Sequence, residues 1–195
     1  GLGLDVWAVI RLANRQPRVN ILSPGPGVGG HCIAVDPWFI VHSAPDRTPL
    51  IRTAREVNDG KVDHAIAQAE ALLAELPDAP VACLGLAFKA NIDDFRESPA
   101  VKVAAALARK HGRRIRIVEP YATALPGAFA GTGAELIDLD QAIADCPLFV
   151  VLVDHDIFRS VPLDERADKR VYDTRGIWPD QPRPAAPPPA LKVAV

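Results

Sequence analysis

Apolar positions divide the chain into two stretches with different spacing. Over residues 48–76 they recur every three or four positions, which is the period of a helix with one buried face. From residue 81 onward, short apolar runs alternate with segments of helical spacing. The pattern predicts a helical first half, one long connecting helix and an α/β second half. The apolar stripe of the long helix consists of Val62, Ala65, Ile66, Ala69, Leu72, Leu73 and Leu76.

The second half alternates predicted strands and helices. Its predicted strands are "VACLGLAF", "RIRIVEP", "LFVVLVDH" and "RVYDTRG". Ser98 and Pro99 are typical of a helix start, Gly112 is typical of a helix end, and "DLDQAIADC" predicts a shorter helix. This order predicts a Rossmann-like parallel sheet covered on both faces, in which ligands bind beyond the carboxyl ends of the strands. The segments expected to carry chemistry follow Phe88, Pro120, His155 and Asp173.

The expected domain limits follow from the prolines. "PDAP" at residues 77–80 ends the long helix, because proline lacks an N–H donor and clashes with the preceding turn. We therefore expect a helical domain over residues 1–77 and a Rossmann-like domain over residues 78–180. The proline- and alanine-rich residues 181–195 are expected to form a disordered tail.

The opening segment, "GLGLDVWAVIRLANR", has the spacing of an amphipathic helix already under way. Val6, Val9, Ile10 and Leu12 lie near one face of this helix, and the chain contains no methionine. We therefore expect the sequence to be part of a longer protein that continues on the N-terminal side.

Composition narrows the function classes. The 195-residue chain is 24% charged with a net charge of -2, so it has no basic surface for nonspecific nucleic-acid binding. No apolar run reaches the length of a membrane helix, and the N-terminus lacks the order of a secretion signal. Three cysteines do not suit a disulfide framework, so we expect a cytoplasmic protein with reduced thiols.

The three cysteines differ in their surroundings. Cys83 and Cys146 lie in or beside apolar strands, where a small buried side chain is expected. Cys32 ends the glycine-rich stretch "PGPGVGGHC", which allows either a close approach to a ligand or a plain turn. Neighbours on a helix or strand do not face each other, so the adjacency of His31 and Cys32 argues little for a proton relay. No cysteine or histidine pair has metal-ligand spacing, so no metal is expected.

The stretch "GLAFKANIDDFRESPA" lacks the G-x-G-x-x-G pattern, which argues against a dinucleotide pyrophosphate at this helix start. It places Lys89 and Arg96 beyond the carboxyl end of a strand. Arg175, in "YDTRGIW", falls on the same predicted rim. These cations suit a phosphorylated ligand, and solvated surface charge is the alternative.

Several stretches resemble the nucleotide-sugar 6-dehydrogenases, the family of UDP-glucose and GDP-mannose dehydrogenases. The resemblance is carried by "RLANRQPRVNILSPGPGVGGHCIAVDPWFIV", "LIRTAREVN", "GLAFKANIDDFRESPA" and "VLVDH", and is strongest to the UDP-N-acetyl-D-mannosamine branch. It implies a helical dimerisation domain followed by a UDP-binding domain, in a homodimer that acts on a UDP-sugar with NAD. The family's NAD-binding domain and its active-site lysine and asparagine would lie upstream, so the fragment alone is expected to be inactive.

The resemblance also implies residue roles. Cys32 matches the nucleophile that captures the sugar aldehyde as a thiohemiacetal and then a thioester, and Asp36 matches the base for the hydrolytic water. Arg96 matches a residue that contacts NAD. Gln16 stands where the branch has histidine, and Arg175 stands where it has lysine. The matches to substrate-binding residues are Gln16, Arg18, Gly29, Phe88, Lys89 and Arg175.

The resemblance leaves alternatives for the function. "CIAVDPWFI" favours the mannosamine branch, because UDP-glucose enzymes typically carry lysine before that aspartate. Oxidation of UDP-glucose or UDP-N-acetyl-galactosamine is the enzymatic alternative. A dimerising UDP-sugar-binding module without catalysis is the alternative from another class.

Overall fold

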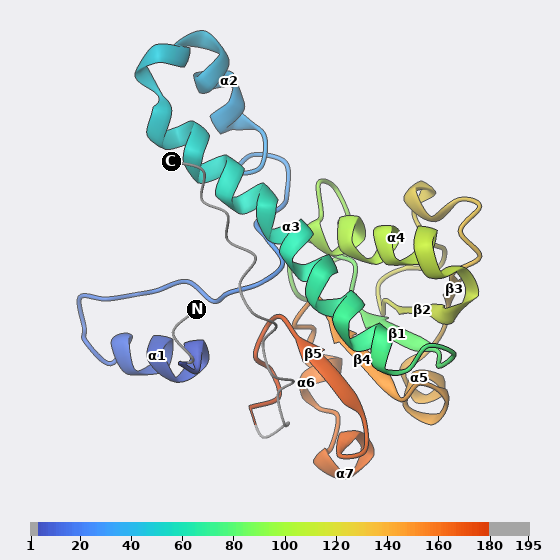
Figure 1. The fold of residues 1–195 in the computed structure, drawn as a ribbon. Coiled ribbons are helices and arrows are strands. Elements are labelled where there is room, and N and C mark those ends of the chain that lie inside the picture. Colours follow the sequence, from blue (N-terminus) through green and yellow to red (C-terminus); the bar gives the residue numbers. More distant parts are fainter. Residues whose placement is uncertain (1–3, 180–195) are drawn as a thin grey trace.

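The parallel sheet forms where the apolar runs predict it. The computed structural model describes residues 4–179 and has five parallel strands in the order β3-β2-β1-β4-β5 (Figure 1). The strands are β1 (Val81–Leu84), β2 (Ile115–Val118), β3 (Glu135–Leu136), β4 (Leu148–Val151) and β5 (Arg170–Asp173). The four predicted strands are confirmed, and β3 is an additional short edge strand. The strand order reverses between β1 and β4, which is where a crevice is expected.

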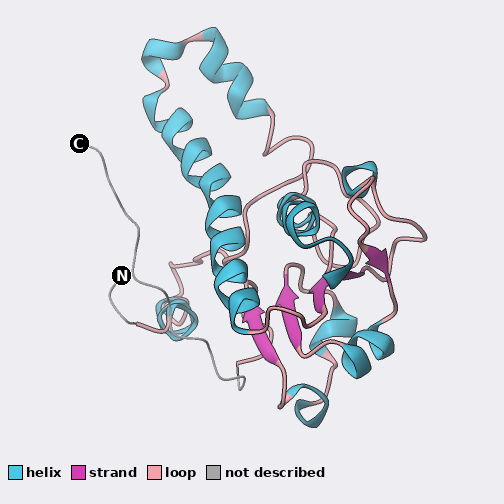
Figure 2. Ribbon diagram, turned by 45° about the vertical axis from the view of Figure 1, so that its right-hand side comes forward, coloured by secondary structure: helices cyan, strands magenta, loops and turns pink. Residues whose placement is uncertain are grey.

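Helices cover both faces of the sheet, as predicted (Figure 2). In β1, Val81 and Cys83 face one core, and Ala82 and Leu84 face the other. The first core is covered by α3 (Pro49–Glu75) and α4 (Pro99–His111), and the second by α5 (Leu139–Asp145) and α6 (Asp156–Arg159). Burial on both faces explains why the central strands β1 and β4 are apolar throughout instead of alternating with polar residues. Further short elements are α7 (Leu163–Arg166) and the 3₁₀ turns Pro45–Arg47, Gly112–Arg114 and Gly127–Phe129.

The limits of α4 follow from its end residues. The Ser98 hydroxyl accepts hydrogen bonds from the amides of Ala100 and Val101, 3.2 and 3.4 Å away, and donates to the Leu86 carbonyl at 2.6 Å. Pro99 occupies the first helical position, and Gly112 ends the helix with a φ of 58°. The predicted cap therefore also fastens the helix start to the chain that leaves β1.

The two halves of the long helix α3 pack against different parts of the protein. Its C-terminal half packs on the sheet with the predicted stripe, of which Ala65, Ala69, Leu72 and Leu73 are buried. Its N-terminal half projects from the sheet and lies beside α2 (Asp36–Ser43). The N-terminal half of α3 and α2 together form a helical arm (Figure 1). On that half Leu50 is 80% exposed, so the arm has apolar surface that the chain does not cover itself.

The opening helix is α1 (Val6–Ala13). Asp5 caps its N-terminus, because the Asp5 carboxylate accepts a hydrogen bond from the Trp7 amide at 3.0 Å. Its predicted apolar face is present, but none of its residues is buried. The predicted tail, residues 181–195, lies outside the described residues. Within residues 4–179, no helix is long and apolar enough to cross a membrane.

Candidate functional site

The loop that follows β1, residues 85–98, crosses to the end of β4. It closes on itself where the Phe88 amide donates to the Asp94 carbonyl at 3.1 Å. Asn91, in the left-handed region with a φ of 61°, donates its amide to Nδ1 of His155 at 2.9 Å. The side chain of Asn91 and Asp156 exchange two further hydrogen bonds, of 2.8 and 3.1 Å. The loop is therefore fastened to the segment that follows β4.

Glu119, directly after β2, holds the start of the same loop through hydrogen bonds. Its carboxylate accepts the amides of Leu86, Ala87 and Tyr121 at 2.6, 3.2 and 3.0 Å. It also lies 3.3 Å from Nε2 of His155, and both side chains are fully buried. Because Nδ1 of His155 accepts a hydrogen bond from the Asn91 amide, the hydrogen bonds assign the imidazole proton to Nε2, which donates to Glu119. Burial alone would raise the pKa of Glu119, but hydrogen bonds from His155 and the Leu86 amide outweigh it and lower that pKa.

This arrangement does not fit a dinucleotide. In dinucleotide-binding Rossmann folds, the amides that follow the first strand face the pyrophosphate and an acidic residue farther along binds a ribose hydroxyl. Here the acid that ends β2, Glu119, takes up the amides of Leu86 and Ala87 instead. Among the described residues, this domain therefore offers no cradle for NAD.

The glycine-rich stretch, residues 24–32, is fastened to α3. Asn58 accepts the Val28 amide at 2.8 Å, and Arg55 donates to the Ile33 carbonyl at 3.3 Å. These bonds set the stretch between the helical arm and the start of α4. Hydrogen bonds to α3 thus hold the chain on both sides of Cys32, at Val28 and at Ile33.

Two glycines of this stretch are required by close packing. A Cβ at Gly29 would lie 2.5 Å from the Glu97 carbonyl oxygen. Gly30 has a φ of 93°, and a Cβ there would lie 3.1 Å from the Phe88 ring. These glycines therefore allow the stretch to pack closely against Glu97 and Phe88. The sequence alone did not decide whether a ligand or a turn required them.

Cys32 is exposed at the end of this stretch, and its sulfur lies 3.0 Å from Nδ1 of His31. The expectation that these neighbours do not face each other is wrong. The rule holds for helices and strands, but residues 30–34 form bends and turns, which allow adjacent side chains to meet. Cys83 and Cys146 are buried as predicted, and burial raises their pKa values to about 12 and about 11. Cys32 is therefore the thiol that a reagent or substrate can reach.

Asp36 is the first residue of α2, four positions after Cys32. Its amide donates to the Cys32 carbonyl at 2.8 Å, which links the thiol to the helix start. Its side chain is exposed. The structure thus brings the predicted nucleophile and base to the same turn.

The predicted cations on the rim have different surroundings. Arg175 is paired with Asp154 through two bonds of 3.0 and 2.7 Å, and Arg159 reaches the other oxygen of Asp154 at 2.5 Å. Burial would raise the pKa of Asp154, but Arg175 and Arg159 lower it. Lys89 is exposed, and no ion pair to it occurs among residues 4–179. Two arginines therefore share the Asp154 carboxylate, while the Asp173 carboxylate accepts the amide of Arg175 at 2.9 Å.

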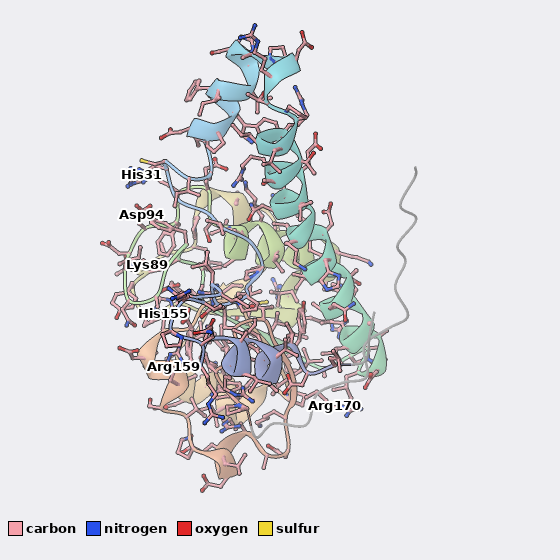
Figure 3. The ribbon with its side chains drawn as sticks, turned by 90° about the vertical axis from the view of Figure 1, so that its left-hand side faces the viewer. His31, Lys89, Asp94, His155, Arg159 and Arg170 are labelled. Carbon is pink, nitrogen blue, oxygen red and sulfur yellow. The ribbon has the colours of Figure 1, made fainter. Side chains whose placement is uncertain are left out.

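Figure 3 shows that His31, Asp94, Lys89, His155 and Arg159 follow one another along one side of the molecule, whereas Arg170 lies elsewhere. Cys32, whose sulfur lies 3.0 Å from His31, is therefore on the same side of the molecule as Lys89 and Arg159.

Three predicted site residues lie outside this arrangement or are already paired. Arg96 forms a bidentate pair with Asp94, with bonds of 2.9 and 2.5 Å, although its side chain is 67% exposed. Gln16 and Arg18 are exposed in the turn after α1. In the described part of the chain, no hydrogen bond joins the side chains of Gln16 and Arg18 to the segment that carries Cys32. Their roles stay predictions.

Five residues that organise this site have no role predicted from the sequence. The sequence contains signals for three of them: Glu119 is an acidic residue directly after a buried strand, and Asp154 and His155 are the "DH" that ends "LFVVLVDH". Their contacts depend on partners far away in the chain and have no local pattern. These residues are Asn91, Glu119, Asp154, His155 and Arg159.

Comparisons with known proteins agree with this geometry. Residues 82–180 match the UDP-binding domain of the UDP-glucose/GDP-mannose dehydrogenase family, and residues 1–60 match its central domain. The chain therefore belongs to the UDP-glucose/GDP-mannose dehydrogenase family.

Individual members of the family are similar to this chain over most of its length. A UDP-N-acetyl-D-mannosamine dehydrogenase of Salmonella typhi is 51% identical over 184 residues, which cover 90% of this chain and 44% of the relative. An NDP-N-acetyl-D-galactosaminuronic acid dehydrogenase of Ralstonia nicotianae is 48% identical over 91% of this chain and 41% of its own. The solved UDP-D-ManNAc dehydrogenase of Pyrococcus horikoshii is 30% identical, with a TM-score of 0.75 over 92% of this chain and 42% of that one. The chain thus spans less than half the length of these relatives.

Proposed function

We propose that this chain is the central and UDP-binding part of a dehydrogenase that oxidises UDP-N-acetyl-D-mannosamine to UDP-N-acetyl-D-mannosaminuronate for surface-polysaccharide synthesis. The observation that carries the proposal is the exposed thiol of Cys32 on the same face as the rim cations. Family membership and a 51% identical relative of that name support the choice of sugar.

The proposed binding mode follows the charges. The diphosphate would bind to Lys89, Arg159 and Arg175, whose side chains donate charged hydrogen bonds. Phe88, on the loop that Glu119 and His155 hold in place, would contact the nucleotide sugar. Gly29, which packs against Glu97, stays the predicted backbone contact to the sugar.

The proposed chemistry of this chain centres on Cys32. Its sulfur would bond to the carbon of the sugar aldehyde and form a thiohemiacetal, which keeps the intermediate on the protein. Asp36, on the same turn, would activate the water that later releases the product. The dehydrogenase family implies a nicotinamide cofactor, NAD in this proposal, which supplies the oxidant. Since the described residues form no cradle for NAD, we assign them no hydride step, and Arg96 stays the predicted point of contact.

We also propose that the protein is a cytoplasmic homodimer, formed through the helical arm. Contiguous exposed apolar side chains mark interaction surfaces, and the arm carries several of them. In such a dimer, Gln16 and Arg18 would reach the substrate of the partner subunit. The exposed apolar residues of α1, α2, α3 and the segment before α1 are Leu4, Val6, Val9, Leu12, Phe39, Ile40, Leu50 and Val57.

The test is an assay of the complete protein with UDP-N-acetyl-D-mannosamine, UDP-N-acetyl-galactosamine and UDP-glucose, each with NAD. We expect uronate formation to be fastest with the mannosamine sugar, and turnover of UDP-glucose alone would overturn the assignment. UDP-N-acetyl-galactosamine is the second candidate, because a 48% identical relative is named for the galactosaminuronic acid.

A calorimetric titration of the 195-residue chain with UDP tests the binding site separately. UDP binding without NAD reduction is expected of this portion. NAD reduction by the portion alone would contradict the view that it lacks a dinucleotide cradle.

A further inference from the structure

The side-chain contact beside the thiol is unexpected from sequence. Nδ1 of His31 lies 3.0 Å from Sγ of Cys32, which is within the range of a hydrogen bond involving sulfur. The bends over residues 30–34 set the two side chains on one side, and Gly30, packed on Phe88, precedes them. A thiol and an imidazole at this distance can exchange a proton.

Two charged groups of the loop after β1 face this pair. Asp94 and Arg96 are bound to each other by bonds of 2.9 to 3.1 Å from Nε and 2.5 Å from Nη2. Hydrogen bonds from Arg96, with smaller contributions from the positive charges of Arg96 and His31, lower the pKa of Asp94 to about 2. Hydrogen bonding to Asp94 raises the pKa of Arg96, and the negative charge of Cys32 adds to this increase.

Asp94 and Arg96 thus place one negative and one positive charge near the imidazole and the thiol. The proposal itself rests on the contact of 3.0 Å between Nδ1 of His31 and Sγ of Cys32.

We propose that His31 is a catalytic residue that takes the proton of the Cys32 thiol when the thiol attacks the sugar aldehyde. Nδ1 of His31 accepts the proton, and the sulfur electron pair forms the bond to the carbonyl carbon. The π pair of the C=O bond moves to the oxygen, which takes up the proton and completes the thiohemiacetal. Thiol and aldehyde thus combine without gain or loss of electrons, and no oxidant is needed for this step.

This inference rests on the proposed role of Cys32, but it can be tested without a sugar. Iodoacetamide alkylates thiolates, and in the folded chain it reaches Cys32, because Cys83 and Cys146 are fully buried. The experiment measures the alkylation rate of the 195-residue chain between pH 6 and pH 8, with Cys32→Ser as the blank.

A thiol without a base partner gains thiolate steeply over this interval. We expect the rate to rise less than about fivefold from pH 6 to pH 8 in the unaltered chain, and more than about thirtyfold in His31→Gln. The matched control is His42→Gln, an exposed histidine of α2, which should retain the shallow profile. His31→Asn serves as a second variant, and equal UDP binding by calorimetry shows that each variant is folded.

An equally steep rise in the unaltered chain and in His31→Gln would overturn the proposal. A shallow rise in His31→Gln would also overturn it, because another group would then account for the thiolate. If the complete protein oxidises a different sugar, the proposed function fails while the alkylation profiles remain valid, so the two failures are distinguishable.

Discussion

Replacing Glu119 by glutamine tests whether the buried carboxylate holds the loop that carries Phe88 and Lys89. The carboxylate accepts three amides and the His155 N–H with its two oxygens. Glutamine has nearly the same shape but only one acceptor oxygen and an NH₂ group that donates. Whichever way the amide turns, at least one buried backbone N–H, of Tyr121 or of the Leu86 pair, faces a donor.

The expected loss can be worked from these contacts. An unsatisfied buried donor costs about 1–3 kcal/mol, and the remaining bonds lose their charge assistance, which is about 1 kcal/mol each. We expect Glu119→Gln to lower the free energy of unfolding by about 4–6 kcal/mol and Tm by roughly 8–24 °C. UDP should also bind more weakly, because the loop after β1 loses its support.

The pH dependence has a definite sign. The pKa of Glu119 is lowered by folding, so its ionisation stabilises the fold above the ordinary value of 4.5 and this contribution is lost as the pH falls through the lower folded value. Glutamine does not titrate. The difference between the unaltered chain and Glu119→Gln should therefore be largest at pH 7 and shrink below pH 4.5.

The assay is urea unfolding followed by circular dichroism at pH 7 and at pH 4, with calorimetric UDP titration at pH 7. Glu56→Gln, at an exposed position of α3, is the matched control and should change stability by less than about 0.5 kcal/mol. A Glu119→Gln chain as stable as the control at pH 7 would refute the reasoning.

Three further substitutions test other parts of the site. Cys32→Ser should abolish uronate formation by the complete protein while UDP binding persists, and unchanged turnover would disprove the covalent role. Gly29→Ala should lower the free energy of unfolding by about 2–4 kcal/mol, because its Cβ would lie 2.5 Å from a backbone oxygen, whereas Gly60→Ala, with open space in α3, should raise it by about 1 kcal/mol in the same denaturation experiment. Lys89→Ala should weaken UDP binding about tenfold in calorimetry, while Lys61→Ala, on α3, should leave it unchanged; equal dissociation constants would remove Lys89 from the phosphate site.

Features that depend on near neighbours were predictable from the sequence. The apolar stripe of α3, the strands and the Ser98–Pro99 start of α4 follow from periodicity and capping, and the structure confirms them. The burial of Cys83 also follows, because its neighbours in the chain are apolar. The resemblance to a family singled out Cys32 and Asp36, which the structure sets on one turn.

The sequence by itself therefore determined the order of helices and strands, the two-sided cover of the sheet and the segments at which chemistry is expected. Tertiary structure decided which groups meet there. Glu119 and His155 are 36 positions apart, and they meet because β2 and β4 both flank β1 and end at the same edge. Arg175 is paired with Asp154 for the same reason, since β4 and β5 are neighbours. His31 meets Cys32 because close packing of the glycine stretch bends the backbone, and a linear pattern of residue types does not encode the direction of that bend.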